Sequence, residues 1–216
     1  MLARQSFYGA TQHKMIWFKK IDGDDMNAID ARASSLVLVD YQARMMPAIH
    51  GADDIIAKAL MLARAAALLE VPVLGTEQNP DRLGPNTDAL ARLCVQTVPK
   101  THFDACSDGL LAALDARAPG RGQVVLAGCE AHVCLLQTAL GLLRAGREVF
   151  VMENASGSRR PSDHAAAIRR LQHAGATIVT HEMVLFEWLH DCRHPRFREV
   201  LALVKSEPVA PTGAHQ

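Results

Sequence analysis

Asp40, Lys100 and Cys134 are the residues whose types and positions point most directly to chemistry. Each lies at or just beyond the end of a short apolar run that predicts a β-strand, and the carboxyl ends of parallel strands share one rim of a sheet. A thiol at that rim can act as a nucleophile, and a carboxylate beside it can accept the thiol proton and return it to a leaving group. We therefore predict that the three side chains converge for nucleophilic catalysis.

Each of these residues has an ordinary structural explanation when it is considered alone. Asp40 could cap a helix, Lys100 could be a solvated surface residue, and Cys134 could be a small buried residue. Their shared position favours function instead. Cys134 lies where a strand turns into a helix, so exposed amides and the positive end of the helix dipole would surround its sulfur and could bind an oxyanion. With Lys100 nearby, we expect the thiol pKa to lie below its free value of ~8.5.

The elements that must position these residues alternate between short strands and longer helices. Near-continuous apolar runs such as Val124 to Ala127 are typical of strands buried on both faces. Strands joined through helices form βαβ crossovers, so we predict an α/β fold with a mainly parallel sheet and helices on both faces. The expected strands are 36–40, 71–77, 95–99, 123–128, 148–153 and 177–181, and the expected helices are about 52–69, 108–117, 132–145 and 162–174.

The globular pattern begins only near Ser35 and ends near Lys205. Residues 1–33 have weak periodicity and mixed charges, so we expect an N-terminal extension outside the core, with Met26 as a candidate start. Residues 34–206 then form the one domain, and residues 207–216 form a polar tail.

Composition argues against nucleic acids and membranes as partners, so a small-molecule substrate is expected. The 216 residues carry a formal net charge of zero and only 5% aromatic residues, and no basic stripe is present, so nucleic-acid binding is not expected. No apolar run approaches the ~18 residues that a membrane-spanning helix needs. The five cysteines form no CxxC pair, which favours free thiols and a cytoplasmic location.

Three segments together resemble the signature segments of the isochorismatase-like cysteine hydrolases, in the same order and at similar spacing. The resemblance extends from about Ser34 to Ser206 and is greatest to the subgroup of isochorismatase domain-containing proteins. It implies a doubly wound, six-stranded, Rossmann-like sheet and an Asp40–Lys100–Cys134 triad. The segments are Leu38-Val39-Asp40-Tyr41-Gln42, Pro99-Lys100 and Gly128-Cys129-Glu130-Ala131-His132-Val133-Cys134.

The resemblance also implies finer features of the site. The peptide bond between Cys129 and Glu130 should be cis, and the backbone amides of Glu130 and Cys134 should form the oxyanion hole. The segment Thr76–Pro80 resembles a substrate-side loop, and we expect Glu77, Gln78 and Phe103 to form part of the substrate wall. A homo-oligomer is expected as well, because the helices Ala57–Leu69 and Leu135–Leu143 are apolar enough to bury more than one face.

Departures from related families limit the chemistry. Nicotinamidases carry an Asp-x-His metal segment where this chain has Thr76–Pro80, without His or Asp, so we expect no metal and no other cofactor. The cluster His190–His194 is interpreted as a surface turn. We expect a hydrolase of small amides or related C–N substrates that forms a thioester on Cys134. Two alternatives stay open: vinyl-ether hydrolysis of the isochorismate type, using Asp40 without covalent catalysis, and a binding or scaffold protein without turnover.

Overall fold

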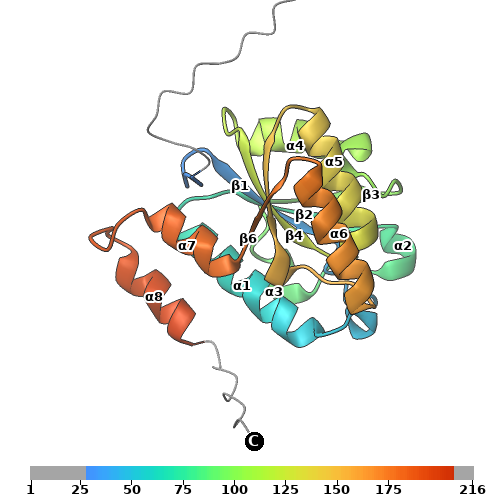
Figure 1. Ribbon diagram of the computed structural model, residues 1–216, viewed down its shortest axis with the longest axis horizontal. Helices are drawn as coiled ribbons and strands as arrows, with labels where there is room; N and C mark the ends of the chain where they lie inside the picture. The colour runs from blue at the N-terminus through green and yellow to red at the C-terminus, as the bar shows by residue number, and fades with distance from the viewer. Residues whose placement is uncertain (1–27, 207–216) are drawn as a thin grey trace, which may run out of the picture.

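The computed structural model describes residues 28–206, which form a parallel sheet covered by helices on both faces (Figure 1). The sheet has six strands in the order β3-β2-β1-β4-β5-β6, and every neighbouring pair is parallel. The predicted α/β class and doubly wound sheet are therefore confirmed. The strands are β1 Ser34–Val39, β2 Val73–Gln78, β3 Gln96–Lys100, β4 Gln123–Gly128, β5 Glu148–Met152 and β6 Thr177–Val179.

The helices divide into two layers. The helices α1, α7 and α8 contribute to the core on one face of the sheet, and α4, α5 and α6 contribute to the core on the other. The first layer has an Ala/Leu-rich first helix, whose composition favours helix formation. The helices are α1 Ala52–Leu68, α2 Pro80–Leu83, α3 Asp88–Ala91, α4 Leu110–Arg117, α5 Leu136–Arg144, α6 Pro161–His173, α7 His181–Leu189 and α8 Phe197–Lys205.

The central strand β1 explains why the apolar runs are almost continuous. Leu36 and Leu38 pack into the core beneath α1, whereas Val37 and Val39 pack into the core beneath α5. Successive side chains of a strand point to opposite faces, so a strand covered on both faces needs apolar residues at every position. The same alternation holds for β4, its neighbour in the sheet.

The strand order reverses between β1 and β4, which are adjacent although β2 and β3 lie between them in sequence. Ligands of open parallel sheets bind in the crevice beyond the carboxyl ends of the strands at such a switch point. Asp40 follows β1, and the turn that carries Cys134 follows β4. The topology therefore places both residues at the expected location for a binding site.

Several element boundaries differ from the predictions, and two of these differences have a local structural reason. The predicted strand 177–181 ends at Val179, because the Thr180 hydroxyl accepts a hydrogen bond from the Met183 N–H, at 3.4 Å, and caps α7. The predicted helix over 132–145 begins as a π-turn, Ala131–Leu135, which leads into α5. This turn matters because it contains Cys134.

The described part of the predicted extension, residues 28–33, packs against the domain rather than outside it. Ile29 is only 1% exposed, and its N–H donates to the Glu187 carboxylate at 2.7 Å. The Arg121 guanidinium donates to the carbonyl oxygens of Ala31 and Ser34 at 2.6 and 2.8 Å. The expected boundary at residue 33 is therefore wrong for these residues. The other predictions for the termini, including the start at Met26, concern residues 1–27 and 207–216, which lie outside the described residues.

Candidate active site

Asp40 is held at the end of β1 in a conformation that few residues adopt. Its φ of 55° lies in the left-handed region, and its side chain is fully buried. Asp tolerates this region better than most residues, and such backbone angles are found where the surrounding structure enforces them. The carboxylate accepts a hydrogen bond from the Thr76 hydroxyl at 2.6 Å and pairs with the Lys100 ammonium at 2.8 Å. Both of its oxygens are therefore engaged.

Lys100, the last residue of β3, is as deeply buried as the carboxylate that it pairs with. Its ammonium group also donates to the Gln78 side-chain oxygen at 2.6 Å and to the His102 carbonyl at 3.4 Å. The ammonium group thus has three oxygen neighbours, two as hydrogen-bond acceptors and one as its ion-paired carboxylate. Lys100 is therefore placed to pair with the Asp40 carboxylate inside the protein.

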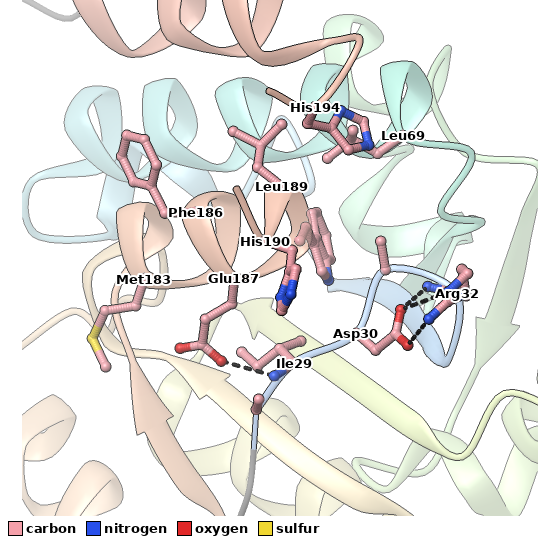
Figure 2. Close-up of a pocket in the computed structure, with 13 residues that line it drawn as sticks. Ile29, Asp30, Arg32, Leu69, Met183, Phe186, Glu187, Leu189, His190 and His194 are labelled. Carbon is pink, nitrogen blue, oxygen red and sulfur yellow. Dashed lines mark hydrogen bonds and ion pairs between the residues drawn. The ribbon is translucent and has the colours of Figure 1, made fainter. Parts of the chain in front are cut away.

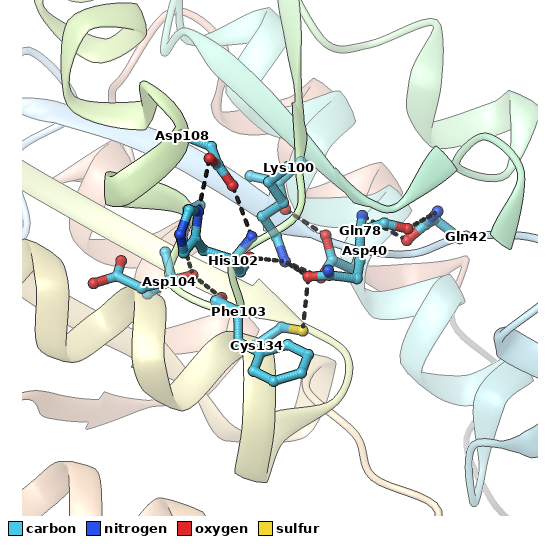
Figure 3. A network of polar contacts seen from close by, with 12 residues as sticks. Asp40, Gln42, Gln78, Lys100, His102, Phe103, Asp104, Asp108 and Cys134 are labelled. Carbon is cyan, nitrogen blue, oxygen red and sulfur yellow. Dashed lines mark hydrogen bonds and ion pairs between the residues drawn. The ribbon is translucent and has the colours of Figure 1, made fainter. Parts of the chain in front are cut away.

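Cys134 lies on the π-turn that precedes α5, with its sulfur facing the same cluster (Figure 3). The residue is 6% exposed, and the Sγ–H donates to the Gln78 side-chain oxygen at 3.7 Å. The structure thus brings Asp40, Lys100 and Cys134 together at one rim, as their positions after strands suggested. Gln78 lies between the lysine and the thiol.

The pKa of the Cys134 thiol is raised, whereas the sequence led us to expect a lowered pKa. Burial raises the pKa of Cys134 to about 12, and the Asp40 carboxylate adds to this rise, whereas Lys100 opposes it. The prediction of a lowered pKa is therefore wrong, because burial penalises a thiolate and the charge of Lys100 is already compensated by Asp40. The resting sulfur is a thiol, so its proton must leave when it attacks.

The backbone before Cys134 is shaped to expose amide groups. The Cys129–Glu130 peptide bond is cis, as the resemblance implied. The Glu130 N–H donates no hydrogen bond within residues 28–206. Gly157 supports the turn on its other side, since its carbonyl accepts from the Ala131 N–H at 2.7 Å and its N–H donates to the Gly128 carbonyl at 3.1 Å. A free N–H at this position is suited to an oxyanion.

Gly128 allows β1 and β4 to approach closely just before this turn. A Cβ atom at residue 128 would lie 2.4 Å from the Val39 carbonyl oxygen and 2.5 Å from the Val39 Cβ. Val39 is its partner in the sheet and directly precedes Asp40. Only glycine therefore permits the spacing that brings the Asp40 and Cys134 segments together.

The three residues predicted for the substrate wall have different surroundings. The Gln78 side chain contacts Lys100 and Cys134, and its amide nitrogen donates to the Thr101 carbonyl at 2.7 Å. Glu77 points to the opposite face of β2, where its carboxylate accepts from the Asn86 N–H at 2.8 Å. Gln78 therefore belongs to the centre of the cluster, and Glu77 is engaged elsewhere.

Phe103, the third of these residues, is 49% exposed and is drawn on the Cys134 side of the network in Figure 3. Its carbonyl oxygen accepts a hydrogen bond from the Thr138 hydroxyl at 3.3 Å, four residues after Cys134. Asp108 holds the start of the same loop, because its carboxylate accepts from the Thr101 and His102 N–H groups at 2.8 and 2.9 Å. The loop after β3 is thus fixed against the helix that carries the thiol.

Sequence reasoning missed two buried residues of this cluster, Thr76 and Gln42. Thr76 contacts Asp40 directly. The Gln42 side chain fixes the end of β2. Its oxygen accepts from the Gln78 N–H at 2.9 Å, and its amide nitrogen donates to the carbonyl oxygens of Gln78 and Gly84 at 3.0 and 2.6 Å. The period of two in a strand was a usable signal, because Thr76 and Gln78 share one face of β2 and Glu77 has the other.

One cavity lies away from this cluster and shares no lining residue with it. It has a volume of about 770 Å³ and is lined by α7, by residues 28–32 and by His190 and His194 (Figure 2).

Within the described residues, no group of three or more His, Cys, Asp or Glu side chains is arranged to hold a metal ion. No helix of this part of the chain is long and apolar enough to cross a membrane.

The buried thiols predict a loss of stability in alkali. Burial is the main reason why the pKa of Cys94 is raised to about 11 and the pKa values of Cys106 and Cys134 to about 12. It raises the pKa of Cys129 further still. In the unfolded chain a thiol ionises near its ordinary pKa of ~8.5. The folded state therefore binds the protons of these thiols more tightly, so this contribution is complete below about pH 8.5 and is lost as the pH rises toward the folded pKa values.

Urea unfolding with reductant present, from about pH 8 to about pH 10.5, measures this loss. Each fully buried thiol should lower the free energy of unfolding by up to ~1.4 kcal/mol per pH unit in that interval. Cys129→Ala removes one such thiol, so its free energy of unfolding should depend less steeply on pH than that of the wild type. Parallel curves for the two proteins would contradict the assignment.

Comparison with known proteins agrees with the fold. The chain matches the Isochorismatase domain family over residues 34–183. It is 36% identical over 184 residues to isochorismatase domain-containing protein 2A of Mus musculus, covering 84% of this chain and 86% of the mouse protein.

Solved structures are similar over most of their length. The MAR1 ribonuclease of Caenorhabditis elegans superposes with a TM-score of 0.78 at 30% identity, covering 88% of this chain and 98% of that one. YcaC of Pseudomonas aeruginosa, solved with hexane-2,5-diol and covalent acrylamide, gives a TM-score of 0.77 at 25% identity, covering 83% and 93%. With the family match extending over most of the described domain, the chain belongs to the isochorismatase family of hydrolases.

Proposed function

We propose that this protein is a cysteine hydrolase that cleaves a small amide or a related C–N substrate through a thioester on Cys134. The observation that carries the proposal is the buried meeting of a thiol, a carboxylate and an ammonium group at the switch point of the sheet. Asp40 is the proton acceptor and donor, because its carboxylate pairs with Lys100 and lies close enough to the thiol to raise the thiol pKa.

The reaction has two halves. The Cys134 sulfur attacks the carbonyl carbon of the substrate while the thiol proton passes to Asp40. The C–N bond then breaks, and Asp40 gives this proton to the departing nitrogen. Water next attacks the thioester and gives one proton to Asp40. The sulfur leaves and recovers this proton, so the products are an amine or ammonia and a carboxylic acid.

Charge develops on the carbonyl oxygen in both halves. We propose that the backbone N–H groups of Glu130 and Cys134 bind this oxyanion, and the unbonded N–H of Glu130 supports that role. Lys100 acts through Asp40, because its ammonium group is ion-paired with that carboxylate and donates to two other oxygens of the protein. Gln78 orients Lys100 and the thiol, and Phe103 forms an apolar part of the substrate wall.

One comparison supports a reactive nucleophile in a similar structure. The structure of Pseudomonas aeruginosa YcaC contains covalent acrylamide, and acrylamide is an electrophile that bears an amide group. A covalent adduct requires a nucleophile in that protein. In this chain we propose Cys134 as the nucleophile.

A substrate panel tests the proposal against its rivals. The panel contains small amides and ureides, isochorismate as a vinyl ether, and single-stranded RNA, since one similar structure is a ribonuclease. Release of ammonia or amine from a member of the first group supports the proposal. Turnover of isochorismate or RNA alone would replace it with vinyl-ether or phosphodiester hydrolysis. Tight binding without turnover of any member would favour a binding protein.

We also propose a homo-oligomer in the cytoplasm, as the resemblance and the free thiols suggested. The apolar residues of α1 do not require a partner subunit, because α7 and α8 of the same chain pack against this helix. Light scattering at micromolar concentration should return a multiple of 23.5 kDa, and a monomer mass would contradict the proposal.

A further inference from the structure

The hydroxyl of Thr76 lies against the carboxylate of Asp40 in the interior of the protein. The two residues come from neighbouring strands, since Thr76 pairs with Val39 in the sheet and Asp40 is the next residue along the chain. Thr76 Oγ1 donates to Asp40 Oδ1 at 2.6 Å, and both residues are 0% exposed. A hydrogen bond to a charged acceptor away from water is stronger than one between neutral groups.

The two oxygens of the carboxylate have separate partners. Oδ1 faces the Thr76 hydroxyl, and Oδ2 faces the Lys100 ammonium. A single pairing with Lys100 would leave the carboxylate free to turn about its bond to Cβ, whereas two partners on different strands fix its plane. Thr76 thus completes the surroundings of the proton acceptor.

We propose that Thr76 is a positioning residue whose hydroxyl holds the Asp40 carboxylate charged and aimed at the thiol of Cys134. The inference rests on the proposed function, in which Asp40 takes the thiol proton. Thr76 itself touches no reacting atom. It acts by stabilising the charged carboxylate more than the protonated acid, because the carboxylate is the better acceptor.

The backbone of Thr76 is held independently of its side chain, which makes a clean substitution available. Its carbonyl oxygen accepts from the Asp40 N–H at 3.2 Å and from the Asn86 side-chain amide at 3.0 Å. Thr76→Val keeps the shape and β-branching but removes the hydroxyl, and Thr76→Ser keeps the hydroxyl. Thr87→Val is a matched control, because the Thr87 hydroxyl has no hydrogen-bond partner among the residues described.

The pH dependence of two rates measures the effect: the alkylation of Cys134 by iodoacetamide, followed by peptide mass spectrometry, and the turnover of an amide found in the panel. In Thr76→Val the acidic limb of both profiles should move up by about one pH unit, with rates about 10-fold lower near neutral pH. Thr76→Ser should restore the wild-type limb, and Thr87→Val should leave it unchanged. The other ionisable groups around Asp40 are Lys100, Cys129 and Cys134, and all variants retain them.

The outcomes separate this proposal from the proposed function. If no amide is turned over but the alkylation limb moves in Thr76→Val and returns in Thr76→Ser, Thr76 positions Asp40 and the substrate class is wrong. If Thr76→Val and Thr76→Ser lower both rates equally without moving the limb, the threonine is only structural and the proposal is overturned. Coincident wild-type and Thr76→Val profiles would overturn it as well.

Discussion

Replacing Cys134 with alanine is expected to abolish turnover of an amide substrate, with a fall of at least ~1,000-fold, because no other group can form the thioester. Cys134→Ser should be equally inactive. A serine hydroxyl is a much weaker acid than a thiol, and Asp40 is too weak a base to activate it. Initial-rate assays on both variants, at substrate concentrations above the wild-type KM, measure the loss.

The thioester itself provides a direct check on the same prediction. Acid quenching of wild-type enzyme during turnover should yield a protein whose mass has increased by that of the acyl group, located on the Cys134 peptide. Cys106→Ala is a suitable control, since its thiol is also partly buried but contacts the Thr138 carbonyl rather than Asp40. Suppose instead that Cys134→Ala remains active on an isochorismate-like ether while Asp40 variants do not. Vinyl-ether hydrolysis would then replace the covalent mechanism.

The second large effect is expected at Asp40. Asp40→Asn keeps the shape of the side chain but cannot accept the thiol proton, so turnover should fall ~100-fold or more. The same change leaves the buried ammonium of Lys100 without its counter-charge, and losing one partner of a buried pair destabilises proteins by about 3–5 kcal/mol. A loss of activity alone would therefore not distinguish failed catalysis from unfolding.

A double variant separates the two effects. Asp40→Asn with Lys100→Met removes both charges, so most of the lost stability should return in urea unfolding while turnover stays at the level of Asp40→Asn. Lys100→Met alone removes the cation that lowers the pKa of the Cys134 thiol, so alkylation near neutral pH should slow further. Recovery of turnover together with stability in the double variant would show that Asp40 is a structural residue.

The high pKa of Cys134 limits the reactivity of its sulfur in the resting enzyme. A thiol with a pKa of about 12 carries almost no thiolate at neutral pH, so its resting reactivity toward iodoacetamide is expected to be modest. Attack on substrate then depends on proton transfer to Asp40 within the cluster. This dependence is why changes at Asp40 and Thr76 should be visible in the alkylation rate as well as in turnover.

The sequence alone determined the architecture, because the physical signals for it are local. Strands covered on both faces require apolar residues at successive positions, as in Leu36 to Val39, and the helices between them require parallel neighbours. Asp40, Lys100 and Cys134 could be singled out because each lies where a strand ends. The alternation of side chains along β2 also separates Gln78 from Glu77, because the two residues face opposite sides of the sheet.

Only the tertiary structure decided how these groups act on one another. The pKa of Cys134 depends on burial by segments far apart in the chain, whereas the features visible in the sequence, the helix start and Lys100, favour the opposite shift. The hydrogen bond from Thr76 to Asp40 and the three acceptors around Lys100 depend on the register of three strands. The packing of Ile29 against α7 likewise joins residues 158 positions apart. Such contacts leave no periodic pattern in the sequence, because the partners meet only when the chain has folded.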